Sequence, residues 1–168
     1  VLGIALDGLG YGDDSTLWGA EFLIASYATA VRVATMKPVA LLGGDLASRE
    51  PWRSLYAHLM AAMTWQDLTT RFADLPLTRH LATKPRPLLD QALRTGLGAP
   101  LASSCGRLFD AIAAALSLHP DRVDHEGQAA IALEQALTPA ALSQAEAEPP
   151  YPIPAVAAPD SVGVVLPC

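Results

Sequence analysis

Short apolar runs separated by glycine turns dominate the first forty residues. Residues 1–6 form an apolar run compatible with a β-strand, and they lead into Asp7-Gly-Leu-Gly-Tyr-Gly-Asp-Asp14, whose glycines permit positive φ angles and close backbone approach. We therefore expect a strand followed by a tight loop. Aromatic and β-branched residues over 16–27 and 30–36 predict two more strands, and a β-meander is the simplest arrangement of the three.

Helical periodicity begins after a second glycine turn, at residues 43–45. Apolar residues recur at three- and four-residue spacing over 49–63, with a proline in the first turn. The expected apolar face consists of Trp52, Leu55, Tyr56, Leu59 and Met63. Further helices are predicted over 65–72, 87–94, 108–116 and 126–137. Residues 138–159 are rich in Ala, Pro and Glu without a sustained period, which indicates a linker or an extended surface segment.

The composition fits one ordinary domain or part of a larger one. Of 168 residues, 51% are apolar and 17% are charged, which excludes disorder throughout the chain. The net charge of −6, with only two lysines, leaves no basic stripe, so we expect no nucleic-acid partner. The apolar stretches are too short for a bilayer and residues 1–6 lack a charged leader region, so we expect no membrane association and a cytoplasmic location.

Metal and thiol chemistry are weakly indicated. Cys105 and Cys168 lie far apart and match no metal-ligand spacing, and no two histidines stand four residues apart, so no metal site is predicted in this chain. Cys105 precedes a predicted helix, which would lower the pKa of its thiol, but no histidine stands nearby as a base. A small packing residue is the favoured interpretation.

Both ends of the chain are apolar. Residues 1–6 and 162–166 are strand-like runs, which leads us to expect that the chain is a fragment of a larger protein. Such a fragment would expose apolar surface that missing segments normally cover, and we therefore expect self-association.

Three segments are candidates for ligand binding, each with a simpler alternative. The 7–14 loop could hold phosphate on its backbone N–H groups or be an ordinary glycine hairpin. The turn at Gly43-Gly44-Asp45 is most simply a turn with a capping carboxylate. Residues 103–107 place small residues at a helix N-terminus, which favours an anion. Asp110 suits either an ion pair with Arg107 or contact with a ribose.

Taken in order, four stretches resemble one family. They are Leu6-Asp-Gly-Leu-Gly-Tyr-Gly-Asp-Asp with Trp18-Gly-Ala-Glu-Phe, Gly43-Gly-Asp through Arg49-Glu-Pro-Trp-Arg53, Ala99-Pro-Leu-Ala-Ser-Ser-Cys-Gly-Arg-Leu-Phe-Asp-Ala111, and Glu126-Gly-Gln-Ala-Ala130. The chain is similar over residues 1–154 to the HypF carbamoyltransferases of [NiFe]-hydrogenase maturation, in the part that resembles the universal tRNA threonylcarbamoyl transferase.

The resemblance implies an α/β (α+β) fold, a fragment of the two-lobed ATPase fold of actin, sugar kinases and seventy-kilodalton heat-shock proteins. It implies use of ATP with Mg²⁺ and carbamoyl phosphate to make carbamoyl adenylate, whose carbamoyl group passes to the C-terminal cysteine of a HypE-type acceptor protein. A further metal ion is implied only for the intact parent. Residues 1–150 would be the partial carbamoyltransferase domain and 151–168 a linker or an aberrant tail.

The resemblance also implies nucleotide- or carbamoyl-adenylate-binding residues, while leaving the catalytic residue unknown. The glycine loop of the family matches Asp7, Gly8, Gly10 and Gly12. Asp110 matches an acidic residue that contacts the ribose in the related tRNA-modifying enzymes. Further matched positions without an assigned role are Gly43, Gly44, Asp45, Ser104, Gly106, Arg107, Glu126 and Gly127.

This chain departs from the family pattern. Leu9 replaces a threonine, which removes a hydroxyl, and His125 replaces a tyrosine. The family's His-His-His-Ala-His and Gly-Gly-Val-Phe-Gln-Asn segments, which carry the expected metal ligands, are not among the 168 residues. The alternatives to a HypF fragment are an O-carbamoyltransferase of secondary metabolism and a non-catalytic nucleotide-binding remnant.

Overall fold

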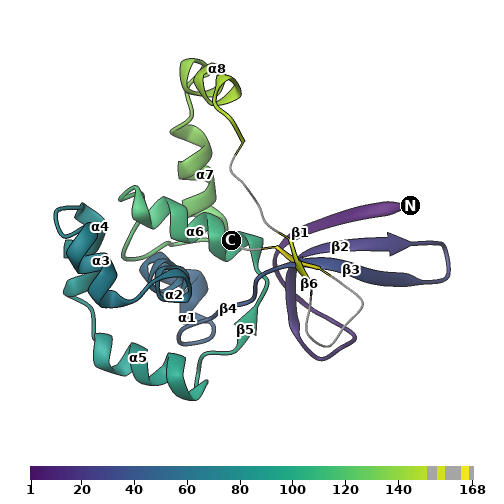
Figure 1. The fold of residues 1–168 in the computed structure, drawn as a ribbon, viewed down its shortest axis with the longest axis horizontal. Coiled ribbons are helices and arrows are strands. Elements are labelled where there is room, and N and C mark those ends of the chain that lie inside the picture. Colours follow the sequence, from purple (N-terminus) through teal and green to yellow (C-terminus); the bar gives the residue numbers. More distant parts are fainter. Residues whose placement is uncertain (151–154, 158–163, 167–168) are drawn as a thin grey trace.

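The first three strands form the predicted meander. The computed structural model describes residues 1–150, 155–157 and 164–166, and Figure 1 shows the strands extending from a cluster of helices. Strands β1 (Leu2–Tyr11), β2 (Leu17–Ala25) and β3 (Ala30–Met36) pair antiparallel in sequence order. Four short strands extend the sheet: β4 (Val39–Ala40), β5 (Leu101–Ala102), β6 (Val156–Ala157) and β7 (Val164–Leu166). Their order is β4-β5-β2-β3-β7-β6, with β1 paired to β2.

The glycine-rich segment after residue 6 is not the tight loop that the sequence predicts. Strand β1 continues to Tyr11, because β2 offers pairing partners on both sides of a register shift between Leu6 and Gly10. Gly8, Gly10 and Gly12 all have negative φ angles, so positive φ is not what these glycines supply. The chain reverses only afterwards, with Ser15 at a φ of 63°.

The predicted helices are present, and three further ones accompany them. The predictions correspond to α2 (Pro51–Ala62), α3 (Trp65–Arg71), α5 (Arg86–Thr95), α6 (Cys105–Ala115) and α7 (Gln128–Gln135). The helices α1 (Leu46–Arg49), α4 (Pro76–Ala82) and α8 (Pro139–Ala147) were not predicted. Together with the sheet they make a mixed α/β fold, which confirms the predicted class.

The hydrophobic core lies among the helices. The predicted apolar face of α2 is confirmed: Trp52, Leu55 and Tyr56 are buried, and Leu59 and Met63 pack partly buried against the same cluster. The cluster is completed chiefly by Leu68, Leu81 and Leu89 from α3 to α5 and by Ala111 and Ala114 of α6. Burial of each leucine side chain stabilises the fold by about 1.5–3 kcal/mol. This core therefore holds α2 and α6 together.

The segment predicted as a linker is partly helical. Thr138 accepts a hydrogen bond from the Ala141 N–H, at 3.1 Å, and starts α8. No residue of α8 is buried, so the helix forms from its cap and its alanines rather than from packing. An unpacked helix needs no apolar stripe, which explains the missing period. The division into 1–150 and 151–168 stays a prediction, and most of the second range lies outside the described residues.

Candidate functional site

A cleft of about 750 Å³ opens where β1, the turn before α1, the start of α6 and the loop before α7 meet. Six residues predicted from the sequence line it: Asp7, Gly8, Gly44, Asp45, Arg107 and Glu126. The other predicted residues lie outside its lining: Gly10, Gly12, Gly43, Ser104, Gly106, Asp110 and Gly127. Four residues that also line the cleft beside Leu9 and His125 were not predicted as site residues, although the second of them opens a family-like stretch: Ser48, Arg49, Arg122 and Asp124.

Glycines bring β1 and β2 into backbone contact with the start of α6 at one end of the cleft. A Cβ atom on Gly106 would lie 2.8 Å from the Cα of Gly8, and one on Gly19 would lie 2.8 Å from the Cα of Ser104. Real Cβ atoms do not approach other atoms so closely, so no other residue fits at 106 or 19 without a shift. The close approach predicted for the glycine loop is thus confirmed at Gly8.

The start of α6 is tied to the same strand. The Ser104 hydroxyl donates to the carbonyl oxygen of Gly8 and accepts a hydrogen bond from the Arg107 N–H, at 3.1 Å. Ser104 is therefore the N-cap of α6 and its link to β1. Burial raises the pKa of the neighbouring Cys105 thiol, which disfavours the thiolate and supports the packing interpretation.

Arg107 and Asp110 form a buried pair. Their side chains approach to 2.9 Å, between Nε and Oδ2, which confirms the predicted ion pair. The two residues are 9% and 4% exposed. The approach is an ion pair without hydrogen-bond alignment, because neither atom has a partner of hydrogen-bond geometry. Arg107 reaches the cleft while Asp110 does not, and ribose contact by Asp110 stays a prediction.

Protonation of Asp110 should stabilise the fold. Burial raises the pKa of this carboxyl from 3.8 to about 6, against the opposing effect of Arg107. The folded state binds the proton more tightly, so this stabilisation is complete below about pH 4 and is lost as pH rises to about 6. We expect the unfolding free energy of the unchanged chain, minus that of Asp110→Asn, to decrease as the pH rises from about 4 to about 6. Urea titrations at several pH values measure it, and a pH-independent difference would contradict the assignment.

The turn before α1 has the geometry that the sequence predicts, but not the cap. Gly43 and Gly44 have φ angles of 86° and 60°, a region that favours glycine. Asp45 occupies the N-cap position of α1, yet its side chain makes no capping hydrogen bond. The capping interpretation of this carboxylate is therefore wrong. Asp45 is exposed and lines the cleft instead.

The loop before α7 is held by backbone hydrogen bonds to the end of α1 and the start of α2. Trp52 donates its N–H to the carbonyl of Pro120 at 3.0 Å, and Val123 donates to the carbonyl of Arg49 at 2.9 Å. Asp121 adds an ion pair with Lys84. These bonds place the side chains of 122–126 along the cleft. The Arg49-Glu-Pro-Trp-Arg53 stretch is thus the anchor of one cleft wall.

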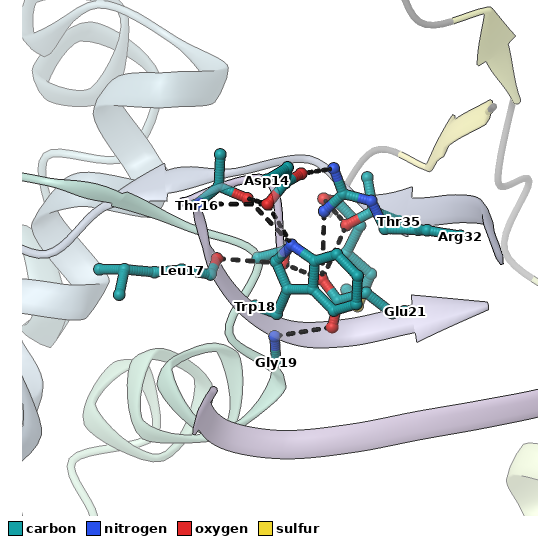
Figure 2. Close-up of polar contacts among 10 residues, drawn as sticks. Asp14, Thr16, Leu17, Trp18, Gly19, Glu21, Arg32 and Thr35 are labelled. Atoms are coloured by element: carbon teal, nitrogen blue, oxygen red, sulfur yellow. Dashed lines mark hydrogen bonds and ion pairs between the residues drawn. The ribbon is translucent and has the colours of Figure 1, made fainter. Parts of the chain in front are cut away.

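A polar network joins β2 to the start of α6 (Figure 2). Glu21 is buried and accepts hydrogen bonds from the Gly19 N–H at 2.8 Å and from the Ser103 hydroxyl. Asp14 accepts from the Trp18 indole and pairs with Arg32 at 2.5 Å, while hydrogen bonding, chiefly from Thr16, lowers its pKa. These contacts account for the Trp18-Gly-Ala-Glu-Phe stretch as a structural element.

The cleft carries charges of both signs. Arg49, Arg107 and Arg122 are suited to phosphate oxygens, and Asp45, Asp124 and Glu126 supply carboxylates of the kind that coordinate Mg²⁺ together with a nucleotide. The donor set thus fits a magnesium nucleotide. Within the described ranges, no group of three histidine, cysteine or acidic residues could hold a metal ion by itself.

Comparison with known proteins defines the class. The chain belongs to the family described as carbamoyltransferase, Kae1-like domain, second subdomain, whose model matches residues 3–163. The relatives it matches are HypF proteins. Carbamoyltransferase HypF of Rhodobacter capsulatus is 47% identical over 131 residues, which cover 78% of this chain and 16% of that protein. The Synechocystis HypF is 40% identical over 149 residues, covering 83% of this chain and 19% of the relative.

Solved HypF structures share the fold. Full-length HypF in its phosphate- and nucleotide-bound form matches 99% of this chain and 20% of that chain, with a TM-score of 0.73 and 28% identity. T. kodakarensis HypF matches 80% of this chain and 18% of that chain, with a TM-score of 0.66 and 36% identity. The chain thus spans less than a fifth of the length of the curated relatives cited. Among its described helices, none has the length and apolar character to cross a bilayer.

Proposed function

We propose that the chain forms one wall of the nucleotide site of a cytoplasmic carbamoyltransferase. The parent enzyme uses ATP and carbamoyl phosphate to form carbamoyl adenylate and transfers the carbamoyl group to the C-terminal cysteine of a HypE-type protein. Membership of the carbamoyltransferase family supports this proposal. The observation that carries it is the cleft, which gathers Asp7, Asp45, Arg107 and Glu126 from four separate stretches of sequence.

The positively and negatively charged residues of the cleft are suited to different parts of the ligand. Arg107 lies at the N-terminus of α6, where the helix dipole adds to its positive charge, so this end suits the phosphate oxygens. Arg122 faces the cleft from the opposite loop. Cationic groups beside the phosphates would stabilise negative charge that develops during acyl transfer. Magnesium, bound with the nucleotide, would supply further charge neutralisation at the carboxylates.

Replacing Arg122 tests the assignment in the intact parent enzyme. We expect Arg122→Gln to raise the dissociation constant of ATP about tenfold or more, because a charge-assisted hydrogen bond contributes about 1.5–3 kcal/mol. Titration calorimetry measures the constant. Arg94→Gln is the matched control, since Arg94 is exposed on α5 outside the cleft lining, and it should leave ATP binding unchanged. Equal binding by both variants would contradict the assignment.

The isolated chain should have little activity, since it spans under a fifth of its relatives. Carbamoyl-phosphate-dependent cleavage of ATP to AMP by the chain alone would contradict this expectation. If the intact parent does not bind ATP either, the chain belongs to a non-catalytic remnant.

A further inference from the structure

The Arg107 side chain lies between the cleft and a buried carboxylate. Arg107 lines the cleft, and its Nε atom is 2.9 Å from Oδ2 of Asp110, three residues further along α6. Both atoms are buried, and neither has a hydrogen-bond partner among the described residues. A well-aligned pair of this type would form charge-assisted hydrogen bonds. The guanidinium is therefore held at Asp110 by charge alone, and a second anion in the cleft can compete for it.

The surroundings of this pair are fixed within the chain itself. The Arg107 N–H donates to the Ser104 hydroxyl at 3.1 Å, and that hydroxyl donates to the carbonyl of Gly8. These bonds hold the backbone of Arg107 at the cleft. Asp110 is 4% exposed in this chain alone. Further segments of a longer protein add cover to the same fold and remove none, so the burial of Asp110 does not depend on where the chain begins or ends.

Arg107 is the charged group that acts on Asp110. The elements packed most closely against α6 are α1, α2, α4, α7, β1 and β2. Their charged side chains and histidines are Arg49, Arg53, His58, Arg79, His80, Glu134, Asp7 and Glu21. None of these described groups contributes to the pKa of Asp110, which responds to burial and to Arg107. The charge state of this carboxyl therefore depends on where the Arg107 guanidinium lies.

We propose that Asp110 is a positioning residue for Arg107 and takes up a proton from solvent when the phosphates of a nucleotide bind Arg107. This inference rests on the proposed function of the cleft. In the free protein the carboxylate holds the guanidinium. Phosphate oxygens compete for it with charge-assisted hydrogen bonds, and they leave behind a buried carboxylate without its cation. A proton on one oxygen of Asp110 removes that buried charge, while Arg107 keeps its own.

The acidity of Asp110 suits this exchange. Burial raises its pKa to about 6, against the opposing effect of Arg107, so at neutral pH the carboxyl of the free protein is mostly charged. When phosphates draw the guanidinium away, the opposing effect weakens and the pKa of Asp110 rises further. Binding and protonation then favour each other, and binding becomes stronger as the pH falls.

The pH dependence of ATP binding tests the coupling. Titration calorimetry of the intact parent enzyme, with ATP in saturating magnesium and without carbamoyl phosphate, gives the dissociation constant. Divided by that of Asp110→Asn, the constant of the unchanged enzyme should rise about tenfold from about pH 5 to about pH 8, because losing a nearby opposite charge shifts an ionisation equilibrium by about this factor or more. His125 also lines the cleft, but it is present in both proteins and cancels in the ratio. A ratio independent of pH overturns the proposal.

The sign of the difference at about pH 8 separates this role from contact with the ribose. Asp110→Asn should bind ATP about tenfold more tightly than the unchanged enzyme, because its neutral side chain leaves Arg107 to the phosphates. Dideoxyadenosine triphosphate, which lacks both ribose hydroxyls, should give the same ratio. A misfolded variant does not gain affinity, so a failure to fold does not mimic this result. Weaker binding by Asp110→Asn, restored to equality with the dideoxynucleotide, assigns Asp110 to the ribose and overturns the proposal.

The protons themselves are counted by calorimetry at pH 7 in buffers of different ionisation enthalpy. The unchanged enzyme should take up about 0.4 of a proton or more beyond the uptake by Asp110→Asn. Asp74→Asn is the matched control, because Asp74 pairs with Arg79 at 3.3 Å but is exposed and outside the cleft lining, and this variant should behave as the unchanged enzyme. Binding heat with equal uptake by all three proteins overturns this inference alone. Absence of binding heat in all three overturns the proposed function and this inference with it.

Discussion

Gly106→Ala is expected to lower the free energy of unfolding by about 2 kcal/mol. Helix propensity alone would predict the opposite change, because position 106 lies in α6, where alanine is a better helix former than glycine by about 1 kcal/mol. A loss of stability would therefore report the close contact between α6 and β1. The new Cβ would lie 2.8 Å from the Cα of Gly8, and the strand must move to admit it. Urea denaturation of the two proteins measures the loss.

Gly3→Ala is the control for this substitution. Gly3 lies in the same strand as Gly8, but the nearest atom to its added Cβ is 3.9 Å away. The free energy of unfolding should change by no more than roughly 0.5 kcal/mol. If Gly106→Ala proves as stable as Gly3→Ala, the contact between β1 and α6 is looser than the structure gives.

Arg107→Met is expected to lower the free energy of unfolding by about 3 kcal/mol at neutral pH. The substitution leaves the buried Asp110 carboxylate without its cation, and the loss of Arg107 raises the pKa of Asp110 above its value of about 6. Below that pH Asp110 takes up a proton, so the loss should be smaller in acid. Urea titrations at neutral and acidic pH measure both effects.

The double variant Arg107→Met with Asp110→Leu separates the pair from its parts. Replacing both members of a buried ion pair with apolar residues of similar size is often neutral or stabilising. We therefore expect the double variant to recover stability to within about 1 kcal/mol of the unchanged chain. A double variant as unstable as Arg107→Met alone would show that Arg107 stabilises the fold through other contacts.

The sequence predicts elements well where one face of an element is buried. The helix α2 follows the period of Trp52, Leu55 and Tyr56, all of which pack in the core. Helix α8 packs on nothing and carries no period, so pattern reasoning assigned it to a linker. The glycines of β1 led to a predicted loop, because sequence alone does not distinguish glycine needed for positive φ from glycine needed for close approach.

The candidate site was predicted only in part, because only some of its residues lie in recognisable motifs. Family-like motifs indicated Asp7, Asp45 and Glu126, which do reach one cleft. Arg122 carries no local signal, and Arg49 opens a family-like stretch without being predicted as a site residue. The two lie 73 residues apart in sequence, and backbone hydrogen bonds such as that from the Val123 N–H to the Arg49 carbonyl bring their segments to one cleft. Asp110 is the opposite case: it matches the family pattern, but it is buried and does not line the cleft.

The loop before α7 is fastened through main-chain atoms at Pro120 and Val123. Those bonds are indifferent to the side chains at 122, 124 and 125, which face the cleft. Point mutations can therefore change the side chains that this loop presents to the cleft while its backbone keeps the same conformation. Such a loop allows ligand preference to change between related enzymes while the fold stays the same. Positions 122, 124 and 125 are therefore suitable targets for directed evolution of the cleft.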